Sequence, residues 1–474
     1  MLPCPLMWVN ARVWSQRQCR AMTQQPSPFA PSALERAVPR YTSYPTAPHF
    51  KPGFEPAAYA RWLGEIAPEA ALSLYLHIPF CDDLCWFCAC RTQGAKRYAP
   101  LERYLELLER EIEMVAAHLG PDHPVSQMHW GGGSPTILKP EHMTRLRAAM
   151  VRHFPRVEGA EFAVEIDPRD MTEARLDALA AAGMTRASIG VQDFDLKVQQ
   201  SIGRLQGHEM TRDVILGLRG HGIESVNIDF LYGLPHQTEA SLARTIEQVL
   251  ALAPDRLALF GYAHVPWMAK RQKMIPEDAL PGTEARRAQA ELARRLLTEA
   301  GYRPVGIDHF ARPGDALARA AEDGTLRRNF QGYTVDPAEA LVGMGASAIG
   351  SLPQGYVQND PGTATWQLKV EAGQLPVAKN IALTLEDRMR RAAIEQILCG
   401  FALDIGRLAD RFGDFARPLA ETAESLVAEA PDGALIPWRG GFRIAEAWRD
   451  RTRLIAAEFD AYLASGTARH SLAV

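Results

Sequence analysis

Short apolar runs alternate with longer amphipathic segments through most of the chain, and this alternation constrains the fold more than any other feature. Each run is rich in strand-forming residues, and each segment that follows has helical periodicity. Candidate strands lie at residues 73–78, 126–130, 162–166, 186–191, 225–231, 256–262 and 302–307. Repeated strand and helix predict a parallel sheet, either open and doubly wound or curved into a (β/α) barrel.

Polar residues stand at the C-terminal ends of these strand candidates, and this placement favours the barrel. In barrel enzymes that edge of the sheet carries the chemistry. The residues are His77, Gly131 to Gly133, Glu165, Gln192, Asp229 and His264. We therefore expect an α/β protein with a partial or open (β/α) barrel.

The last part of the chain has a different pattern. After about residue 360 the strand signal fades and helical segments take over. Within this part ALIPWRGGFRIAEAWRD, residues 434–450, is typical of a hairpin followed by a helix. Residues 361–474 are therefore predicted to form a smaller, mostly helical C-terminal domain of winged-helix type.

Composition excludes several classes of protein. The chain has 474 residues, 47% of them hydrophobic, and a net charge of −4 without a long basic run. Nucleic-acid binding would need a basic surface, so no nucleic-acid partner is expected. No window approaches 18 consecutive apolar residues, so no membrane span is expected either. Seven cysteines, mostly in one cluster, do not form a secreted disulfide framework and fit a reducing cytoplasm.

The first residues have no clear structural pattern. The opening MLPCPLMWV is too short for a secretory signal, although its acid-free, Arg-containing character is compatible with a transit peptide. We prefer to interpret residues 1–21 as a disordered extension or a mis-called start, with Met22 as the natural beginning. The disordered N-terminal extension as a whole is predicted to cover residues 1–35.

Four cysteines lie within ten positions in IPFCDDLCWFCAC. Cys81, Cys85 and Cys88 have C-x3-C-x2-C spacing directly after a strand, and Cys90 follows. A structural zinc site would normally need a second ligand pair, which makes zinc a minor alternative. A compact cysteine loop suits an iron–sulfur cluster, and three ligands on four irons leave one iron free. Incidental buried cysteines are a third, weaker interpretation.

The loop resembles that of the radical S-adenosylmethionine (SAM) superfamily, and the text around it is similar to oxygen-independent coproporphyrinogen III oxidases. Matching segments are PRYTSYPTA, HWGGGSPT, EIDPR, SIGVQDF, NIDFLYGLP, DHFARP and NFQGYT. The resemblance implies a radical SAM barrel over residues 71–360 and a substrate-covering N-terminal segment over 36–70. It also implies a [4Fe-4S] cluster held by Cys81, Cys85 and Cys88, with Cys90 outside the ligand set.

Several of these segments can be interpreted physically. The glycines of HWGGGSPT let backbone groups approach a zwitterionic ligand, although a tight turn would also require them. Glu165 ends an apolar strand and could neutralise an ammonium group. Asp229 lies in a buried-looking strand and needs a partner, for which a ribose diol or Arg204 would serve. Asp167 precedes Pro168 and is more typical of a surface turn.

The resemblance implies two SAM sites. The first would contain Tyr75, Gly132, Glu165 and Ile349. The second would contain Phe87, Gly133, Ser134, Gln192, Arg204, Asp229 and Ala263. Whether the second SAM is a co-substrate or a resident ligand stays open.

Substrate contacts are expected around the same edge of the barrel. Candidates for substrate binding or catalytic support are His77, Cys90, His309 and Arg312. The substrate implied by the resemblance carries four propionates, and Arg312 is the first candidate for a propionate contact, with His309 second. A structural ion pair is an equal alternative for either residue.

The reaction implied is the anaerobic oxidative decarboxylation of two propionates of coproporphyrinogen III to vinyl groups, giving protoporphyrinogen IX in haem biosynthesis. A 5′-deoxyadenosyl radical made from SAM at the cluster would start it. The partners implied are an electron donor such as flavodoxin or a ferredoxin, and the chain would act as a cytoplasmic monomer. Two alternatives remain: a haem-binding chaperone of the same superfamily, and a non-catalytic zinc-binding interaction protein.

Overall fold

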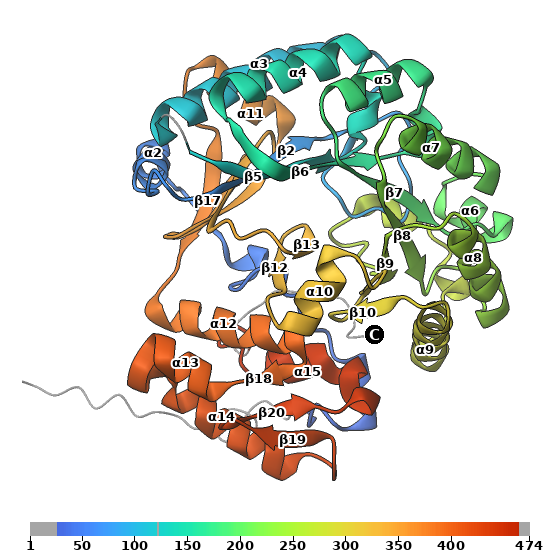
Figure 1. Cartoon of the computed structure of the whole chain (residues 1–474), viewed down its shortest axis with the longest axis vertical. Helices are drawn as coiled ribbons and strands as arrows, with labels where there is room; N and C mark the ends of the chain where they lie inside the picture. Colours follow the sequence, from blue (N-terminus) through green and yellow to red (C-terminus); the bar gives the residue numbers. More distant parts are fainter. Residues whose placement is uncertain (1–25, 121–122, 464–474) are drawn as a thin grey trace, which may run out of the picture.

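The computed structural model describes residues 26–120 and 123–463, and thirteen strands of these residues form one curved sheet (Figure 1). Its middle consists of parallel strands, each paired with the next. In spatial order they are β14 (Ala340–Met344), β2 (Leu72–Ile78), β5 (Val125–Gly132), β6 (Arg156–Ile166), β7 (Arg186–Gln192), β8 (Ser225–Tyr232) and β9 (Arg256–Gly261). The first six predicted strands are therefore confirmed, whereas β14 was not predicted.

Antiparallel strands extend the sheet at both edges. Beside β14 lie β15 (Ile349–Leu352), β16 (Gly355–Asn359), β17 (Val377–Ala382) and β1 (Lys51–Pro52), and beside β9 lie β11 (His309–Ala311) and β10 (Arg303–Val305). The strand predicted at residues 302–307 is shorter than expected: β10 covers Arg303–Val305, because the chain turns at Gly306 (φ 56°) and forms the β10–β11 hairpin. The edge strands β1 and β10 do not pair, so the barrel is partial.

Helices cover the convex face of the curved sheet (Figure 1). They are α3 (Ala99–Leu119), α4 (Pro140–His153), α5 (Glu173–Ala181), α6 (Leu196–Ile202), α7 (His208–Gly220), α8 (Glu239–Ala251) and α9 (Thr283–Glu299). On β6 the alternate residues Phe162, Val164 and Ile166 join the apolar core. Glu161 and Glu165 occupy the alternate positions of the strand and therefore point to the concave side. The core thus lies outside the sheet and the polar groups lie inside it.

The remaining elements lie around the sheet. They are α2 (Pro56–Gly64), β3 (Phe80–Cys81) paired with β4 (Gln93–Gly94), α10 (Ala316–Asp323), β12 (Arg327–Asn329) paired with β13 (Gly332–Thr334), and α11 (Thr363–Glu371). None of the described helices is both long and apolar enough to cross a membrane.

The C-terminal part packs across the open side of the sheet (Figure 1). It contains α12 (Leu385–Gly400), β18 (Ala402–Leu403), α13 (Ile405–Phe412), α14 (Arg417–Glu429), β19 (Leu435–Trp438), β20 (Gly441–Ile444) and α15 (Thr452–Ala457). The predicted hairpin is present, since β19 and β20 pair antiparallel, and α15 follows it. A partial barrel with a smaller, mostly helical C-terminal part is therefore confirmed.

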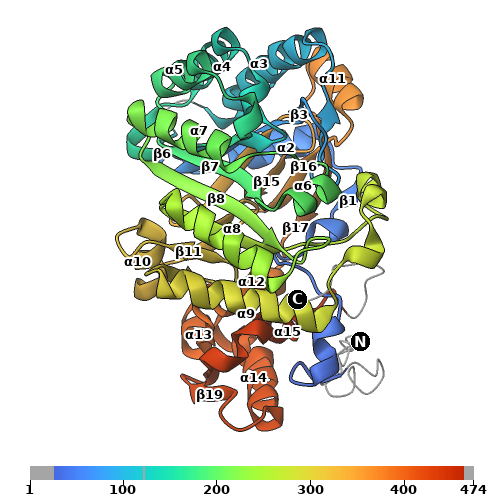
Figure 2. The ribbon, with the colours of Figure 1, turned by 90° about the vertical axis from the view of Figure 1, so that its right-hand side faces the viewer.

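Two predicted boundaries need correction. The main sheet continues past residue 360, because β17 pairs with both β16 and β1. Residues 26–35 are also not a disordered extension: Phe29, Ala33 and Leu34 are buried in the apolar core of the C-terminal part. Figure 2 shows this N-terminal segment beside the C-terminal helices. Residues 1–25, including Met22, lie outside the described residues.

An ion-pair chain fills the inside of the barrel near the N-terminal ends of the strands. Glu161 of β6 pairs with Arg186 of β7 at 2.9 Å and with Arg256 of β9 at 3.5 Å, and Arg256 pairs with Asp315 at 2.8 Å. Burial opposes the charge on Glu161, but the two guanidinium groups lower its pKa to about 2. These contacts join three strands across the concave side.

Replacing Glu161 with Gln is expected to lower the free energy of unfolding by about 3 kcal/mol at pH 7, because buried Arg186 loses its carboxylate partner and Arg256 keeps Asp315 alone. The folded-state pKa lies below the unfolded value of about 4.3, so the stabilisation is full above pH 5 and is lost as the pH falls towards 2. Urea midpoints of wild type and Glu161→Gln should therefore converge as the pH falls. Glu158→Gln, at an exposed position of β6, is the control; equal midpoints for both variants at pH 7 would contradict the ion-pair role.

Candidate active site

The cysteine loop lies at the C-terminal end of β2, between β3 and β4. Cys85 is buried, and its sulfur accepts weak hydrogen bonds from Arg204 Nη1 at 3.5 Å and Arg169 Nη2 at 3.6 Å. Burial raises the pKa of Cys81 to about 12, and the nearby Cys88 and Cys85 thiols add to this shift. Three thiols thus lie close together beside two guanidinium groups. This set fits a cluster whose thiolate ligands carry negative charge.

Cys90 lies next to Cys88 and not across the loop. The Cys90 N–H donates to Cys88 Sγ at 3.4 Å, and Arg271 donates to the Cys90 carbonyl at 3.2 Å. These contacts give Cys90 a place beside a predicted ligand. Its exclusion from the ligand set stays a prediction.

The glycine run ends β5 directly beside this loop. Gly132 has a φ of 106°, and a Cβ atom at this position would lie 2.5 Å from the ring of His77. A Cβ atom at Gly133 would lie 2.4 Å from the carbonyl oxygen of Phe80. At Gly132 the positive φ and the close approach of His77 both exclude a side chain, and the approach of a ligand to this backbone stays a prediction.

Glu165 is held as an anion at the end of β6. Its Oε2 accepts from the Gly132 N–H at 3.0 Å, and its Oε1 lies 3.2 Å from His129 Nε2. Burial would raise the pKa of Glu165, but these hydrogen bonds and the nearby histidines lower it overall. An ionised carboxylate beside the cysteine loop and the glycine run is suited to an ammonium group.

Tyr75 and His77 lie on β2 beside this carboxylate. The Tyr75 hydroxyl is 3.0 Å from His77 Nδ1, and His77 Nε2 is 3.1 Å from the Arg91 carbonyl. The carbonyl can only accept, so Nε2 carries the proton and Nδ1 accepts from Tyr75. Burial lowers the pKa of His77, so the ring is neutral. Gly343 of β14 is in register with Tyr75 of β2. A Cβ atom at Gly343 would lie 2.7 Å from the carbonyl oxygen of Ile349, so Ile349 lies beside β14 near Tyr75.

Asp229 has neutral partners and does not pair with Arg204. Asn227 Nδ2 donates to its Oδ1 at 2.8 Å, and Ser188 Oγ donates to its Oδ2 at 3.2 Å. Burial raises the pKa of Asp229. The prediction that Arg204 could be the partner of the Asp229 carboxylate is therefore wrong in this structure.

Arg204 instead binds Asp167, the residue interpreted from sequence as a surface turn. Its Nη1 lies 2.9 Å from Asp167 Oδ2, and its Nη2 donates to the Gly190 carbonyl at 2.7 Å. Asp167 also pairs with Arg169 at 2.7 Å. The sequence EIDPR places Asp167 two residues before Arg169, which could have indicated that local ion pair. The pairing of Asp167 with the distant Arg204 had no sequence signal.

The other predicted second-SAM residues lie around the same loop. Gln192 has a left-handed φ of 69°. A Cβ atom at Gly190 would lie 2.9 Å from the Gln192 amide nitrogen and 3.3 Å from Arg204 Nη2, so both side chains lie beside Gly190. Ser134 Oγ donates to Asp170 at 2.6 Å, and the carbonyls of Phe87 and Ala263 both accept from Gln272 Nε2. Gln272 is fully buried and was missed from sequence, because its role depends on two distant carbonyls.

The two predicted substrate contacts lie at opposite ends of β11. His309 pairs with Ala258, which pairs with Asp229 on the next strand, so His309 and Asp229 face the same side. Arg312 instead donates to the carbonyls of Pro254 and Ala253, at 3.0 and 3.1 Å. Because β11 runs antiparallel to β9, Arg312 lies at the N-terminal edge of the parallel strands. This placement does not support the propionate contact predicted for Arg312.

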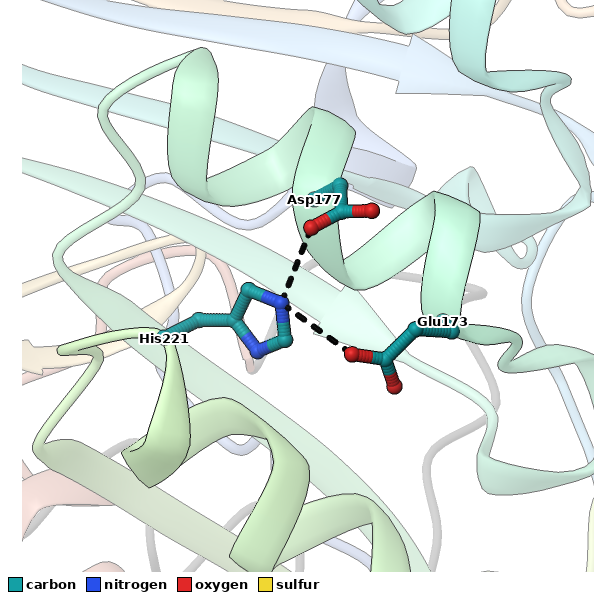
Figure 3. Close-up of side chains that lie close together, drawn as sticks. All are labelled: Glu173, Asp177 and His221. Atoms are coloured by element: carbon teal, nitrogen blue, oxygen red, sulfur yellow. Dashed lines mark hydrogen bonds and ion pairs between the residues drawn. The ribbon is translucent and has the colours of Figure 1, made fainter.

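Another group of possible metal ligands lies on the helical face, away from the cysteine loop. Figure 3 shows Glu173 and Asp177 of α5 turned towards His221, which follows α7. His221 Nδ1 donates to the Gly217 carbonyl at 2.7 Å, so Nε2 faces Asp177 at 3.1 Å and Glu173 at 3.5 Å. This exposed group joins two neighbouring helices by charge.

Comparison with known proteins agrees with this geometry. Residues 75–249 match the radical SAM superfamily. The solved structure of coproporphyrinogen III oxidase (HemN) from Escherichia coli, titled a radical SAM enzyme, superposes with a TM-score of 0.85 and 37% identity over 90% of this chain and all of that one. The curved sheet and its three-cysteine loop therefore define a radical SAM enzyme.

Curated relatives narrow the class further. The oxygen-independent coproporphyrinogen III oxidase of Paracoccus denitrificans is 48% identical over 93% of this chain and 97% of its own length. That of Bradyrhizobium diazoefficiens is 47% identical over 94% of this chain and 99% of its own length. The chain belongs to the oxygen-independent coproporphyrinogen III oxidase family.

Cys90→Ser is expected to leave the iron and labile sulfide content of anaerobically reconstituted protein unchanged, because the other three thiols are the predicted ligands of the cluster. Cys85→Ser, the matched change at a buried predicted ligand, should remove the cluster and its visible absorbance. Loss of iron from the Cys90 variant would contradict the assignment of three ligands.

Proposed function

We propose that this chain converts two propionate side chains of coproporphyrinogen III to vinyl groups by anaerobic oxidative decarboxylation, giving protoporphyrinogen IX. The observation that supports this most strongly is 48% identity over nearly the whole length of a named oxidase, with the three-cysteine loop at the C-terminal edge of the sheet. The enzyme is a radical SAM oxidoreductase of porphyrin biosynthesis.

As a radical SAM enzyme the chain uses a [4Fe-4S] cluster and SAM. When bound, these supply the 5′-deoxyadenosyl radical that removes a hydrogen atom from the propionate. Cys81, Cys85 and Cys88 are proposed to hold the cluster. Arg204 and Arg169 donate to the Cys85 sulfur and so offset the charge of the thiolates.

The first SAM is proposed to bind beside Glu165, Gly132, Tyr75 and Ile349. Glu165 is ionised and lies next to the cysteine loop, so it can receive the ammonium group of the methionine part. The Gly132 N–H and His129 orient this carboxylate. The absence of a side chain at Gly132 leaves the neutral His77 ring in place.

A second SAM is proposed to bind at Phe87, Gly133, Ser134, Gln192, Arg204, Asp229 and Ala263. Asp229 accepts one hydrogen bond on each oxygen, and each oxygen has a further lone pair for a ribose hydroxyl. The Ser134 hydroxyl donates to Asp170 and accepts from Thr136, and the Ser134 N–H donates to the Phe80 carbonyl, so one lone pair of the hydroxyl oxygen remains for a ligand.

Residues 36–70 and the C-terminal part are proposed to cover the substrate. Their placement across the open side of the sheet would keep solvent from a reactive radical. A one-electron carrier such as flavodoxin or a ferredoxin is proposed as the electron donor. The exposed Asp82, Asp83 and Cys90 place the cysteine loop within reach of such a carrier. We also propose that the enzyme acts as a cytoplasmic monomer.

Anaerobic incubation of the reconstituted protein with SAM, a reductant and coproporphyrinogen III should release two CO2 per substrate and form protoporphyrinogen IX, measured by chromatography after oxidation. Glu165→Gln should lower the rate at least tenfold, by about 1.5 kcal/mol or more, since the ammonium loses its charged partner. Glu158→Gln, the same substitution at an exposed position of β6, lies outside the proposed site and is the matched control.

A haem-binding chaperone of the same superfamily would give no vinyl product in this assay. A zinc-binding interaction protein would contain zinc without labile sulfide after anaerobic purification. Either result would overturn the proposed function.

A further inference from the structure

A group of arginines lies beyond the residues that the cofactor sites use. Arg40 precedes α2, Arg286 lies on α9, Arg328 on β12 and Arg453 on α15. Arg40, Arg328 and Arg453 interact electrostatically with Asp308, and Arg286 interacts with Arg40. They come from the N-terminal segment, the sheet region and the C-terminal part. The fold therefore gathers positive charge where these three parts meet.

Arg40 and Arg328 have few charged partners. Arg40 Nη2 donates to the Gly261 carbonyl, which is neutral. The Arg328 side chain is 5% exposed, and its Nη1 lies 3.9 Å from Asp308 Oδ1. Among the described residues, the Nε and Nη1 of Arg328 have no hydrogen-bond partner. A buried guanidinium group with unused donors is unfavourable unless a ligand completes it.

Asp308 cannot neutralise this group alone. Its Oδ1 is already 2.7 Å from His309 Nδ1, which competes with Arg328 for the same oxygen. Burial lowers the pKa of Arg40, and the neighbouring Arg328 acts in the same direction. Burial also lowers the pKa of Arg453 to about 10, with Arg40 contributing. The surroundings of the arginines therefore favour added negative charge.

The arginines lie next to the proposed cofactor site. His309 is in register with Ala258 and Asp229 on the concave side, and Asp308 precedes His309. Arg40 reaches the end of β9 at Gly261, and Arg286 donates to the Tyr262 carbonyl at 2.8 Å. A molecule lying along the C-terminal edge of β8 and β9 could therefore reach both groups of residues.

We propose that Arg40 and Arg328, with Arg286 and Arg453 nearby, bind the propionate carboxylates of the substrate that are not being decarboxylated. This inference rests on the proposed function, because the substrate has four propionates and only two react. Guanidinium groups bind carboxylates through two parallel hydrogen bonds, which fix orientation as well as charge. Such anchoring would turn the reacting propionate towards the cofactor site.

The test uses the full-length, anaerobically reconstituted enzyme. Arg40→Met and Arg328→Met are each expected to raise KM for coproporphyrinogen III at least about tenfold, with a much smaller change in kcat. Arg328→Lys keeps the charge but not the planar fork, so its KM should be intermediate. Iron content and the thermal midpoint report on folding, and the Lys variant gives the answer if the Met variant does not fold.

A binding experiment separates recognition of carboxylates from general packing. Fluorescence titration with coproporphyrin III and with its tetramethyl ester should show tighter binding of the acid by wild type, and Arg328→Met should remove most of this difference. Arg312→Met, the same substitution at the other end of β11, is the control and should bind like wild type.

The outcomes distinguish the inference from the proposed function. Wild-type affinity and KM in both Arg40→Met and Arg328→Met would overturn the inference while leaving the proposed function intact. An acid and an ester that bind equally to wild type would also overturn it. A wild-type enzyme that forms no vinyl product would overturn the proposed function instead.

Discussion

The inner face of the curved sheet is polar, and the rest of the structure depends on satisfying it. Outward residues such as Phe162 and Val164 join the helices in one apolar core, so the intervening residues must point inwards. Towards the N-terminal ends of the strands, Glu161, Arg186 and Arg256 satisfy one another. Buried charges persist only when paired, and this pairing fills the lower part of the barrel. The C-terminal ends are left for ligands.

At the C-terminal ends of the strands, the polar side chains have protein partners but keep the capacity to bind a ligand. Glu165 is kept ionised by His129 and a backbone N–H. Asp229 is held by an amide and a hydroxyl, and both can remain in place when a ligand arrives. Arg204 connects the cysteine loop to Asp167 and Gly190, so it joins the proposed cluster site to the proposed second SAM site.

Much of the fold could be predicted from local pattern. Six of the parallel strands and the C-terminal hairpin were visible as apolar runs, since these residues pack in the core whatever their neighbours are. The antiparallel extension was not. β17 pairs with β16 and also with β1, more than 300 positions earlier in the chain, and the chain reverses at one glycine between β10 and β11. The pairing with β1 has no local signal.

The sequence by itself determined the chemistry of the site, because that chemistry is carried by residue types within short segments. These are three closely spaced cysteines, a glycine run and a carboxylate at the end of a strand. Only the tertiary structure decided which distant groups meet. Asp167, interpreted from sequence as part of a surface turn, pairs with Arg204 in the structure. Arg312 lies at the N-terminal edge of the parallel strands, away from the proposed cofactor sites. The tertiary structure also brought Arg40 and Arg328 together from positions 288 residues apart. Strand direction and domain packing set these contacts, and both depend on long-range pairing that no short stretch of sequence encodes.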